Sequence, residues 1–153
     1  MTPARTQSVS AERIVATSPD QIFDVLTDPS RHPVLDGSGM VQSSRPRNPK
    51  RLQLGSKFRM DMQLGPLPYR ITNKVVEFEA NRIIAWQHQG RHRWRWELEP
   101  AAAGGTRVRE SFDWSTALWP RGLELVGYPE RNLAAIEQTL DRLVQHFETR
   151  PTG

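Results

Sequence analysis

Strict alternation of residue types between positions 91 and 99 is the feature that most limits how this chain folds. The segment reads Arg-His-Arg-Trp-Arg-Trp-Glu-Leu-Glu. In a β-strand, successive side chains point to opposite faces. One face therefore carries His92, Trp94, Trp96 and Leu98, and the arginines take the other. The pattern predicts a strand with one aromatic, buried face and one charged face toward solvent.

Two functions fit such a segment in isolation: a basic, aromatic surface for nucleic acid, and the wall of an apolar pocket. Stacking on bases requires rings that are exposed beside the positive charges, whereas alternation separates the two. The chain has 21 Lys and Arg interspersed with 17 Asp and Glu, for a net charge of +4. Because no block of like charges appears, we predict no nucleic-acid partner and favour the pocket wall.

Composition narrows the class of protein further. A length of 153 residues suits one domain, and the absence of cysteine excludes disulfides, thiolate metal sites and cysteine nucleophiles. The four histidines are scattered without a ligand spacing, so we expect no metal and no cofactor. We find no apolar run of membrane-spanning length and no secretion signal, and therefore predict a cytoplasmic protein without membrane insertion. We expect it to be a monomer or a homodimer.

Hydrophobic periodicity predicts an α+β order in one domain, residues 9–148, between flexible ends at 1–8 and 149–153. Ser18 and Pro19 are typical of a helix start, and Asp28 with Pro29 restarts a second short helix. The predicted strands are 9–17, 40–44, 56–64, 69–79, 83–89, 92–99 and 106–115. A loosely helical stretch reaches Gly127. A long helix then begins at Pro129, with an apolar stripe that must pack on the sheet: Leu133, Ile136, Leu140, Leu143 and Phe147.

Several short motifs in this order carry a resemblance to a known superfamily. They are Ser18-Pro19, Asp28-Pro29, Arg82-Ile83-Ile84-Ala85-Trp86, Trp94 to Pro100, Gly105 to Val108, Phe112 to Ser115 and Leu140 to Leu143. The chain resembles the helix-grip superfamily (SRPBCC) of START-related and birch-pollen-allergen-like proteins, in particular bacterial polyketide cyclase/dehydrase and lipid-transport types.

The resemblance implies a curved antiparallel sheet of about seven strands that grips the C-terminal helix, with two short helices after the first strand. It also implies a hydrophobic cavity between helix and sheet. Relatives include polyketide cyclases, lipid and hormone carriers, quinone-binding proteins and chaperone activators, so the resemblance brings a cavity but no catalytic residue.

The residues on the predicted inner faces are mostly large, and a packed core needs small residues opposite large ones. The large side chains therefore point to the same cavity. A dry core of these rings is the alternative. The predicted ligand-binding residues are Phe58, Met60, Met62, Ile71, Asn73, Trp86, Trp94, Trp96, Phe112, Trp114, Leu133, Ile136 and Leu140.

The hairpin near Gly90 decides which polar groups join these residues. A two-residue turn at Gly90 and Arg91 would separate Trp94 from Trp86, whereas a three-residue turn at 89–91 with a bulge places them on one side, with His88. We favour the three-residue turn because it gathers the aromatic residues on one face.

Three polar residues are then candidates for acid and base chemistry. Glu110 on an apolar face would have its pKa raised by desolvation and would act as a general base, with His88 or His92 as acid or orienting partner. The competing interpretation pairs Glu110 with an arginine and leaves both histidines at the rim. Enzyme activity stays open at this point.

The sequence thus predicts a protein that binds or transports a small hydrophobic or aromatic ligand, such as a lipid, polyketide or quinone-like molecule, in an internal cavity. One alternative is a cofactor-free enzyme of the polyketide cyclase/dehydratase type that uses acid/base residues in that cavity. A further alternative is a protein-interaction module similar to the chaperone activators.

Overall fold

An antiparallel sheet and one long helix dominate the computed structural model, which describes residues 7–35, 41–44, 48–64 and 66–148. The elements, in chain order, are β1 (Ser8–Val15), α1 (Pro19–Leu26), the 3-10 helix η1 (Pro29–Arg31), α2 (His32–Leu35), β2 (Val41–Ser44), β3 (Lys57–Leu64), β4 (Leu67–Glu79), β5 (Ile83–Gln87), β6 (Arg93–Pro100), β7 (Thr106–Asp113), α3 (Pro120–Leu125) and α4 (Tyr128–Glu148).

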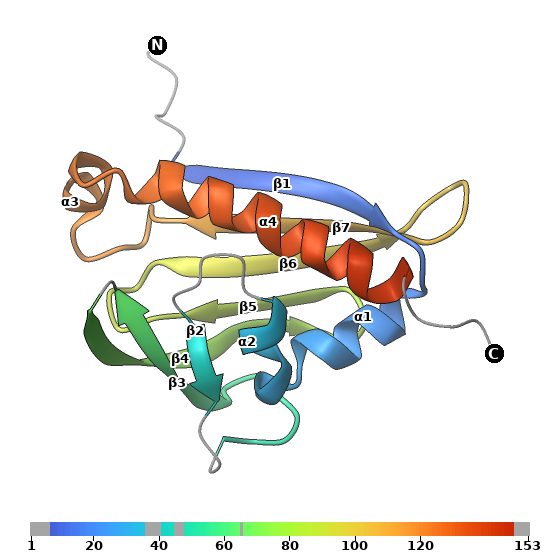
Figure 1. Ribbon diagram of the computed structural model, residues 1–153, viewed down its shortest axis with the longest axis horizontal. Coiled ribbons are helices and arrows are strands. Elements are labelled where there is room, and N and C mark those ends of the chain that lie inside the picture. The colour runs from blue at the N-terminus through green and yellow to red at the C-terminus, as the bar shows by residue number, and fades with distance from the viewer. Residues whose placement is uncertain (1–6, 36–40, 45–47, 65, 149–153) are drawn as a thin grey trace.

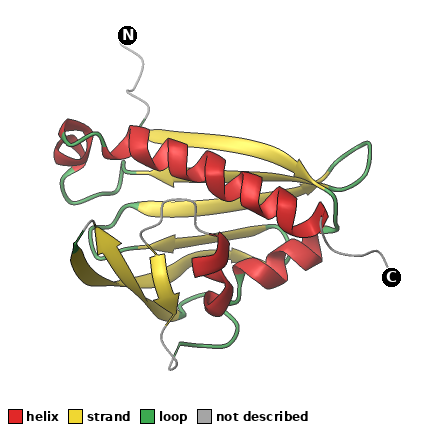
Figure 2. Cartoon of the chain, in the orientation of Figure 1, coloured by secondary structure: helices red, strands yellow, loops and turns green. Residues whose placement is uncertain are grey.

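The seven strands are ordered β1-β7-β6-β5-β4-β3-β2. Strands β2 to β7 form a meander, whereas β1 and β2 are neighbours in sequence but lie at opposite edges. The segment containing α1, η1 and α2 therefore crosses the sheet from one edge to the other. These helices and α4 lie over the same face (Figure 1; Figure 2). This is the predicted α+β class and the helix-grip architecture.

Helix α4 packs mainly on one half of the sheet, because it contacts β1 and β7 (Figure 1). Its predicted stripe supplies the buried Ile136, Leu140, Leu143 and Phe147, and small or polar positions such as Ala135 and Thr139 are buried with them. The strands at the far side, β3 to β5, are thus not covered by α4 alone.

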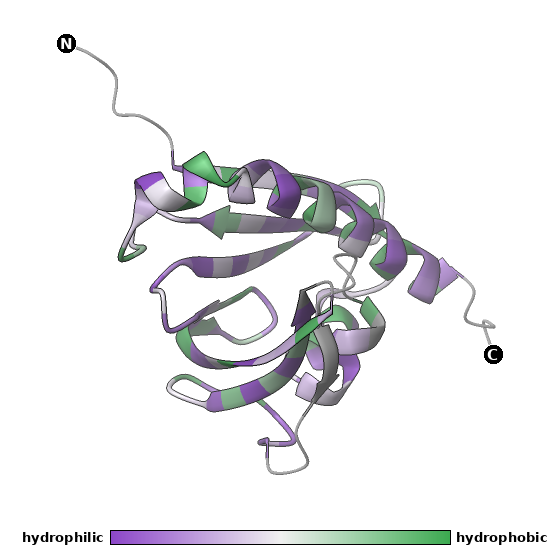
Figure 3. Cartoon of the chain, turned by 60° about the vertical axis from the view of Figure 1, so that its left-hand side comes forward, coloured by the Kyte–Doolittle hydropathy of each residue, from purple (hydrophilic) through white to green (hydrophobic). Residues whose placement is uncertain are grey.

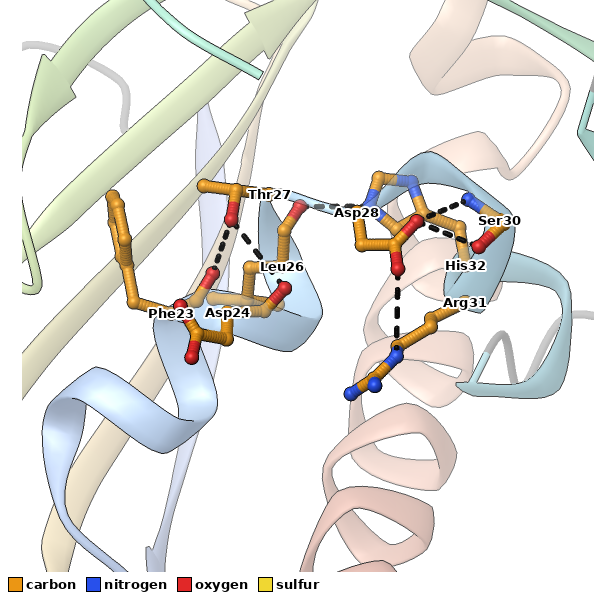
Figure 4. A network of polar contacts seen from close by, with 8 residues as sticks. All are labelled: Phe23, Asp24, Leu26, Thr27, Asp28, Ser30, Arg31 and His32. Atoms are coloured by element: carbon orange, nitrogen blue, oxygen red, sulfur yellow. Dashed lines mark hydrogen bonds and ion pairs between the residues drawn. The ribbon is translucent and has the colours of Figure 1, made fainter. Parts of the chain in front are cut away.

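The corner between α1 and α2 is fixed by local polar contacts (Figure 4). The Thr27 hydroxyl donates to the Phe23 carbonyl at 2.8 Å. The Asp28 carboxylate accepts from the Ser30 backbone N–H at 3.1 Å, which caps η1. The His32 Nε2 lies 2.8 Å from the Leu26 carbonyl, and since a carbonyl only accepts, this nitrogen carries the proton. These contacts link the end of α1 to the start of α2.

The alternation in β6 has the predicted consequence. Trp96 and Leu98 are buried, whereas Arg95 lies on the outer face, where its Nε is 3.1 Å from the Glu77 carboxylate and its guanidinium also pairs with Glu97. Figure 3 shows the same alternation of hydrophobic and hydrophilic residues along the strands. Arg95 thus belongs to an ion-pair network on the outside of the sheet, and the rings point toward the helix.

The hairpin between β5 and β6 is the three-residue turn that the sequence favoured. Trp86 pairs with Trp94 across the strands, and the His88 N–H donates to the His92 carbonyl at 3.3 Å. Arg91 has φ of 65°, the left-handed conformation that this type of turn needs at its last position. The rings of β5 and β6 therefore share one face with His88, as predicted.

Some predicted boundaries were wrong by one or two residues. Strand β4 begins at Leu67, which pairs directly with Leu64, so the predicted turn at 65–68 is shorter than expected. Strand β5 ends at Gln87 because the next residues form the hairpin. Strand β1 begins at Ser8, inside the end that was predicted to be flexible. Residues 1–6 and 149–153 of the predicted flexible ends lie outside the described residues.

Among the described residues, no helix is both long and apolar enough to cross a bilayer.

The hairpin geometry predicts that Arg91→Gly stabilises the protein. A residue with a Cβ pays about 1 kcal/mol at a left-handed position, and glycine does not. Relative to Arg91→Ala, which removes the same side chain but keeps the Cβ, we expect the free energy of unfolding of Arg91→Gly to be higher by about 1 kcal/mol in urea titrations. Equal stability of the two variants would contradict a left-handed residue at this position.

Candidate functional site

A cavity of about 290 Å³ lies between the sheet and α4. This volume is at the small end of the range of ligand pockets, which begins at about 300 Å³. Its walls come from β3 to β7, from the corner between α1 and α2, and from the first half of α4. The lining is mostly apolar and aromatic, with a few polar side chains among the rings.

Most of the predicted site residues line this cavity. The predicted ligand-binding residues that do so are Phe58, Met60, Met62, Ile71, Asn73, Trp86, Trp94, Trp96 and Ile136. The three candidates for acid and base chemistry, Glu110, His88 and His92, line it as well. They meet because the inward positions of five neighbouring strands converge on one space.

Four of the predicted ligand-binding residues do not line the cavity. Phe112 lies behind the lining rings, 4.9 Å from Trp94 between centroids. Trp114 follows the end of β7, and its indole N–H donates to the Glu124 carboxylate at 2.9 Å. Leu140 lies deeper along α4 and belongs to the dry core, and Leu133 is turned partly toward solvent.

The sequence prediction missed several lining residues, for two reasons. On α4, the side that faces the cavity is the row Asn132, Ala135, Ile136 and Thr139, in which three members are small or polar. Small residues three or four positions apart on a helix leave space beside it. Such a row among larger residues is the sequence signal that could have located this side of α4. The others reach the cavity only through tertiary folding: Leu26, His32, Leu35, Tyr69, Gln89, Gly90 and Tyr128.

Four buried polar atoms on lining residues have no hydrogen-bond partner within the described chain. Two belong to donor groups, Trp96 Nε1 and Asn132 Nδ2, and the others are Asn73 Oδ1 and His88 Nε2. A buried polar atom left without a partner costs about 1–3 kcal/mol of stability. Proteins seldom keep such atoms without a purpose, and their gathering around one space is typical of a site that holds a polar group of a ligand.

His88 and His92 form a contacting pair at the hairpin end of the cavity. Their ring centroids are 4.5 Å apart, and His92 also lies 6.1 Å from the Tyr128 ring. Burial, and secondly the charge of His92, lowers the pKa of His88 to about 3; burial lowers the pKa of His92 to about 4. Both rings are therefore neutral at pH 7, and each offers one donor and one acceptor. Burial also raises the pKa of the Tyr128 phenol, which stays protonated.

A second group of rings closes the opposite wall. His32 stacks on Trp86 with centroids 5.1 Å apart and planes at 22°, and Phe58 meets both rings edge-on. Since the other side of His32 is bonded to the Leu26 carbonyl, this wall is tied to the α1 to α2 corner (Figure 4). Flat rings on this wall offer a surface on which an aromatic ligand can stack.

The hairpin that carries Gly90 is fastened to the loop after β7. The Leu118 N–H donates to the Gly90 carbonyl at 2.9 Å, and the Thr116 hydroxyl donates to the Arg91 carbonyl at 2.5 Å. Gly90 lines the cavity, whereas Leu118, whose backbone is hydrogen-bonded to Gly90, is exposed and does not line it. This end of the cavity therefore has an apolar rim that is held by two hydrogen bonds.

Metal chemistry has no preformed site in the described part of the chain. No group of three or more His, Asp or Glu side chains there is arranged to hold an ion. What the cavity does offer is neutral hydrogen-bonding groups and one carboxyl group, Glu110, inside apolar walls.

Comparison with known sequences identifies a family and close relatives. The family described as polyketide cyclase / dehydrase and lipid transport matches residues 6–148. The uncharacterized protein Rv0088 of Mycobacterium tuberculosis (strain ATCC 25618 / H37Rv) is 41% identical over 143 residues, which are 91% of this chain and 63% of that protein. The chain thus spans less than two thirds of the length of this curated relative.

Solved structures share the fold at low sequence identity. A protein from Rhodobacter sphaeroides superposes with a TM-score of 0.73 at 18% identity, covering 97% of both chains. The ginseng major latex-like protein 151 from Panax ginseng gives a TM-score of 0.69 at 11% identity, covering 92% of this chain and 96% of that one. At such identities the likeness shows the fold alone.

The histidine pair predicts a loss of stability in mild acid. The folded state holds both pKa values below the unfolded value of 6.5, so the unfolded chain binds more protons as the pH falls from 6.5 to about 4. The free energy of unfolding should be nearly constant above about pH 7.5 and fall by roughly 3 kcal/mol per histidine toward pH 4.

Urea titrations across this pH range measure the effect. The variant carrying both His88→Gln and His92→Gln lacks the titrating rings and should lose less than half as much stability over the same interval. An identical acid dependence in this variant and the wild type would contradict the assignment to the pair.

Proposed function

The chain belongs to the polyketide cyclase/dehydrase and lipid-transport family, and we propose that it binds a small hydrophobic or aromatic molecule in the cavity between the sheet and α4. The observation that carries the proposal is the combination of apolar walls with buried polar atoms that lack a partner in the described chain. Apolar walls supply affinity, and a few fixed polar groups orient the ligand.

The dimensions and walls of the cavity favour a compact ligand. A volume of about 290 Å³ suits about two fused rings or a medium-length acyl chain. The stacked pair of His32 and Trp86 on one wall favours a flat ring system. The Trp96 indole N–H, which can only donate, favours a carbonyl or hydroxyl oxygen on that ring system.

Binding of a neutral aromatic ketone tests this proposal. We expect 2-acetylnaphthalene to bind, as measured by isothermal titration calorimetry, and Trp96→Phe to weaken its binding about tenfold, because the variant keeps a ring but loses one hydrogen-bond donor. Trp114→Phe is the matched control: its indole N–H donates to Glu124 and lies outside the cavity, so its Kd should stay within twofold of the wild type.

Dodecan-1-ol extends the same experiment to a ligand with a flexible alkyl chain. Binding of neither 2-acetylnaphthalene nor dodecan-1-ol would contradict the proposal. An equal loss in Trp96→Phe and Trp114→Phe would remove the role given to the Trp96 donor.

A catalytic function is the second candidate, and a specific observation favours it: Glu110, His88 and His92 line the same cavity. A carboxylate can take a proton from the carbon beside a ketone, which leaves the electron pair on an enolate oxygen. The Trp96 N–H would stabilise that oxygen, the neutral histidines would orient the ketone by hydrogen bonds, and the Glu110 carboxylic acid would return the proton. Ring closure or dehydration of a polyketide begins with this step.

Exchange of the methyl protons of 2-acetylnaphthalene in D2O, followed by NMR, isolates that step. If Glu110 is the base, the wild type accelerates the exchange and Glu110→Gln reduces the acceleration by at least about a hundredfold. Glu77→Gln on the outer face of the sheet is the control and should behave as the wild type. Binding of the ketone without accelerated exchange would restrict the protein to binding or transport.

A further inference from the structure

The charges of the cavity lining are unusual for a basic protein. The chain has 21 Lys and Arg, yet no lysine or arginine is found among the cavity-lining residues of the described chain. The basic residues of β6 point away from it, where Arg95 pairs with Glu77 and Glu97. Glu110 is the one Asp or Glu in the described lining. An anionic ligand would therefore meet a carboxyl group and no fixed positive charge.

The other sources of positive potential near the cavity are weak. Burial keeps His88 and His92 neutral at pH 7, since it lowers their pKa values to about 3 and about 4. Tyr128 begins α4 at the cavity, but the first turn of this helix has few free amides: Pro129 has no N–H, and the Arg131 N–H donates to the Gly127 carbonyl at 3.2 Å. A carboxylate or phosphate would thus lose its hydration without gaining a cationic partner.

The polar atoms that do face the cavity suit an uncharged molecule. Asn73, Trp96 and Asn132 have exposed fractions of only 2%, 4% and 7%, and each presents a buried atom without a protein partner. Trp96 and Asn132 present N–H donors, Asn73 presents an acceptor oxygen, and His88 adds a neutral ring nitrogen. Together they complement a ligand that carries an acceptor and a donor within one small molecule.

We infer that the cavity selects uncharged ligands that carry both a hydrogen-bond acceptor and a donor, such as hydroxy-ketones, phenols or amides on an aromatic frame, and rejects free carboxylic acids. The inference rests on the proposed binding function and specifies its ligand class. It assigns the ligand's acceptor to the Trp96 and Asn132 donors and its donor to Asn73 or His88. Free fatty acids are thereby excluded as ligands of this cavity, whereas neutral lipids are not.

A matched pair of probes tests the inference. The probes 2-naphthamide and 2-naphthoate have the same frame and shape and differ in charge at pH 7.5. We expect calorimetry on the full chain to show the amide binding at least 30-fold more tightly than the carboxylate, and at least as tightly as 2-acetylnaphthalene, which lacks the donor.

The outcomes separate the inference from the proposed function. Equal or tighter binding of 2-naphthoate would overturn the inference and leave the binding function standing. Tighter binding of 2-acetylnaphthalene than of the amide, by tenfold or more, would overturn the requirement for a donor. Failure of all three probes to bind would overturn the proposed function, and the inference with it.

The Glu110→Gln variant tests the contribution of the carboxyl group. It should raise the affinity for 2-naphthoate relative to that for 2-naphthamide at least fivefold, because the change removes the one carboxyl group in the described lining. Glu99→Gln makes the same change of net charge at an exposed site near Arg107 and should move neither value. An unchanged ratio in Glu110→Gln, or an equal change in Glu99→Gln, would overturn the role of Glu110. Thermal unfolding of both variants checks that each is folded.

Discussion

The cavity exists because one helix must cover a sheet face that is too large and too bulky for it. Helix α4 packs on β1 and β7, whereas the large inward side chains of β3 to β6 lie beyond its reach. The side of α4 that overlooks them carries Ala135 and Thr139, which are too short to fill the remaining space. A close-packed interior would need larger side chains at these two positions of the helix. The cavity therefore results both from the position of α4 on the sheet and from the small side chains on this side of the helix.

The polar groups in this space have a cost that the rest of the fold must offset. Four buried atoms without a protein partner would each destabilise the chain by about 1–3 kcal/mol, a large share of the stability of a typical domain. Elsewhere, Arg95 on the outer face of β6 pairs with Glu77 and Glu97, and the α1 to α2 corner closes its own hydrogen bonds. Such an uneven distribution is typical of proteins whose binding site competes with stability.

Features of the fold and the site that depend on local geometry could be predicted from the sequence, whereas those that depend on tertiary packing could not. Period-two alternation placed Trp94 and Trp96 correctly, because the face of a strand is a local property. The turn at 89–91 was also predictable, since only one register gathers the rings. The depth of a residue is different: Phe112 and Leu140 lie on the predicted faces but behind or below the cavity, because depth depends on where α4 crosses the sheet. Asn132 was missed for a related reason, since a search for the most apolar stripe passes over the residues that leave space.

The hydrogen-bonded rim at the β5 to β6 hairpin affects the rate of ligand release more than the affinity. The Gly90 and Arg91 carbonyls are held by Leu118 and Thr116 from the loop after β7, so separating these two segments breaks both hydrogen bonds at once. Loop motions of this kind take place in nanoseconds to microseconds when free and become slower as each restraint is added. For a molecule that leaves past this rim, the residence time would depend on residues outside the cavity lining. Two proteins with identical cavity walls but different rims would hold the same ligand equally well and release it at different speeds.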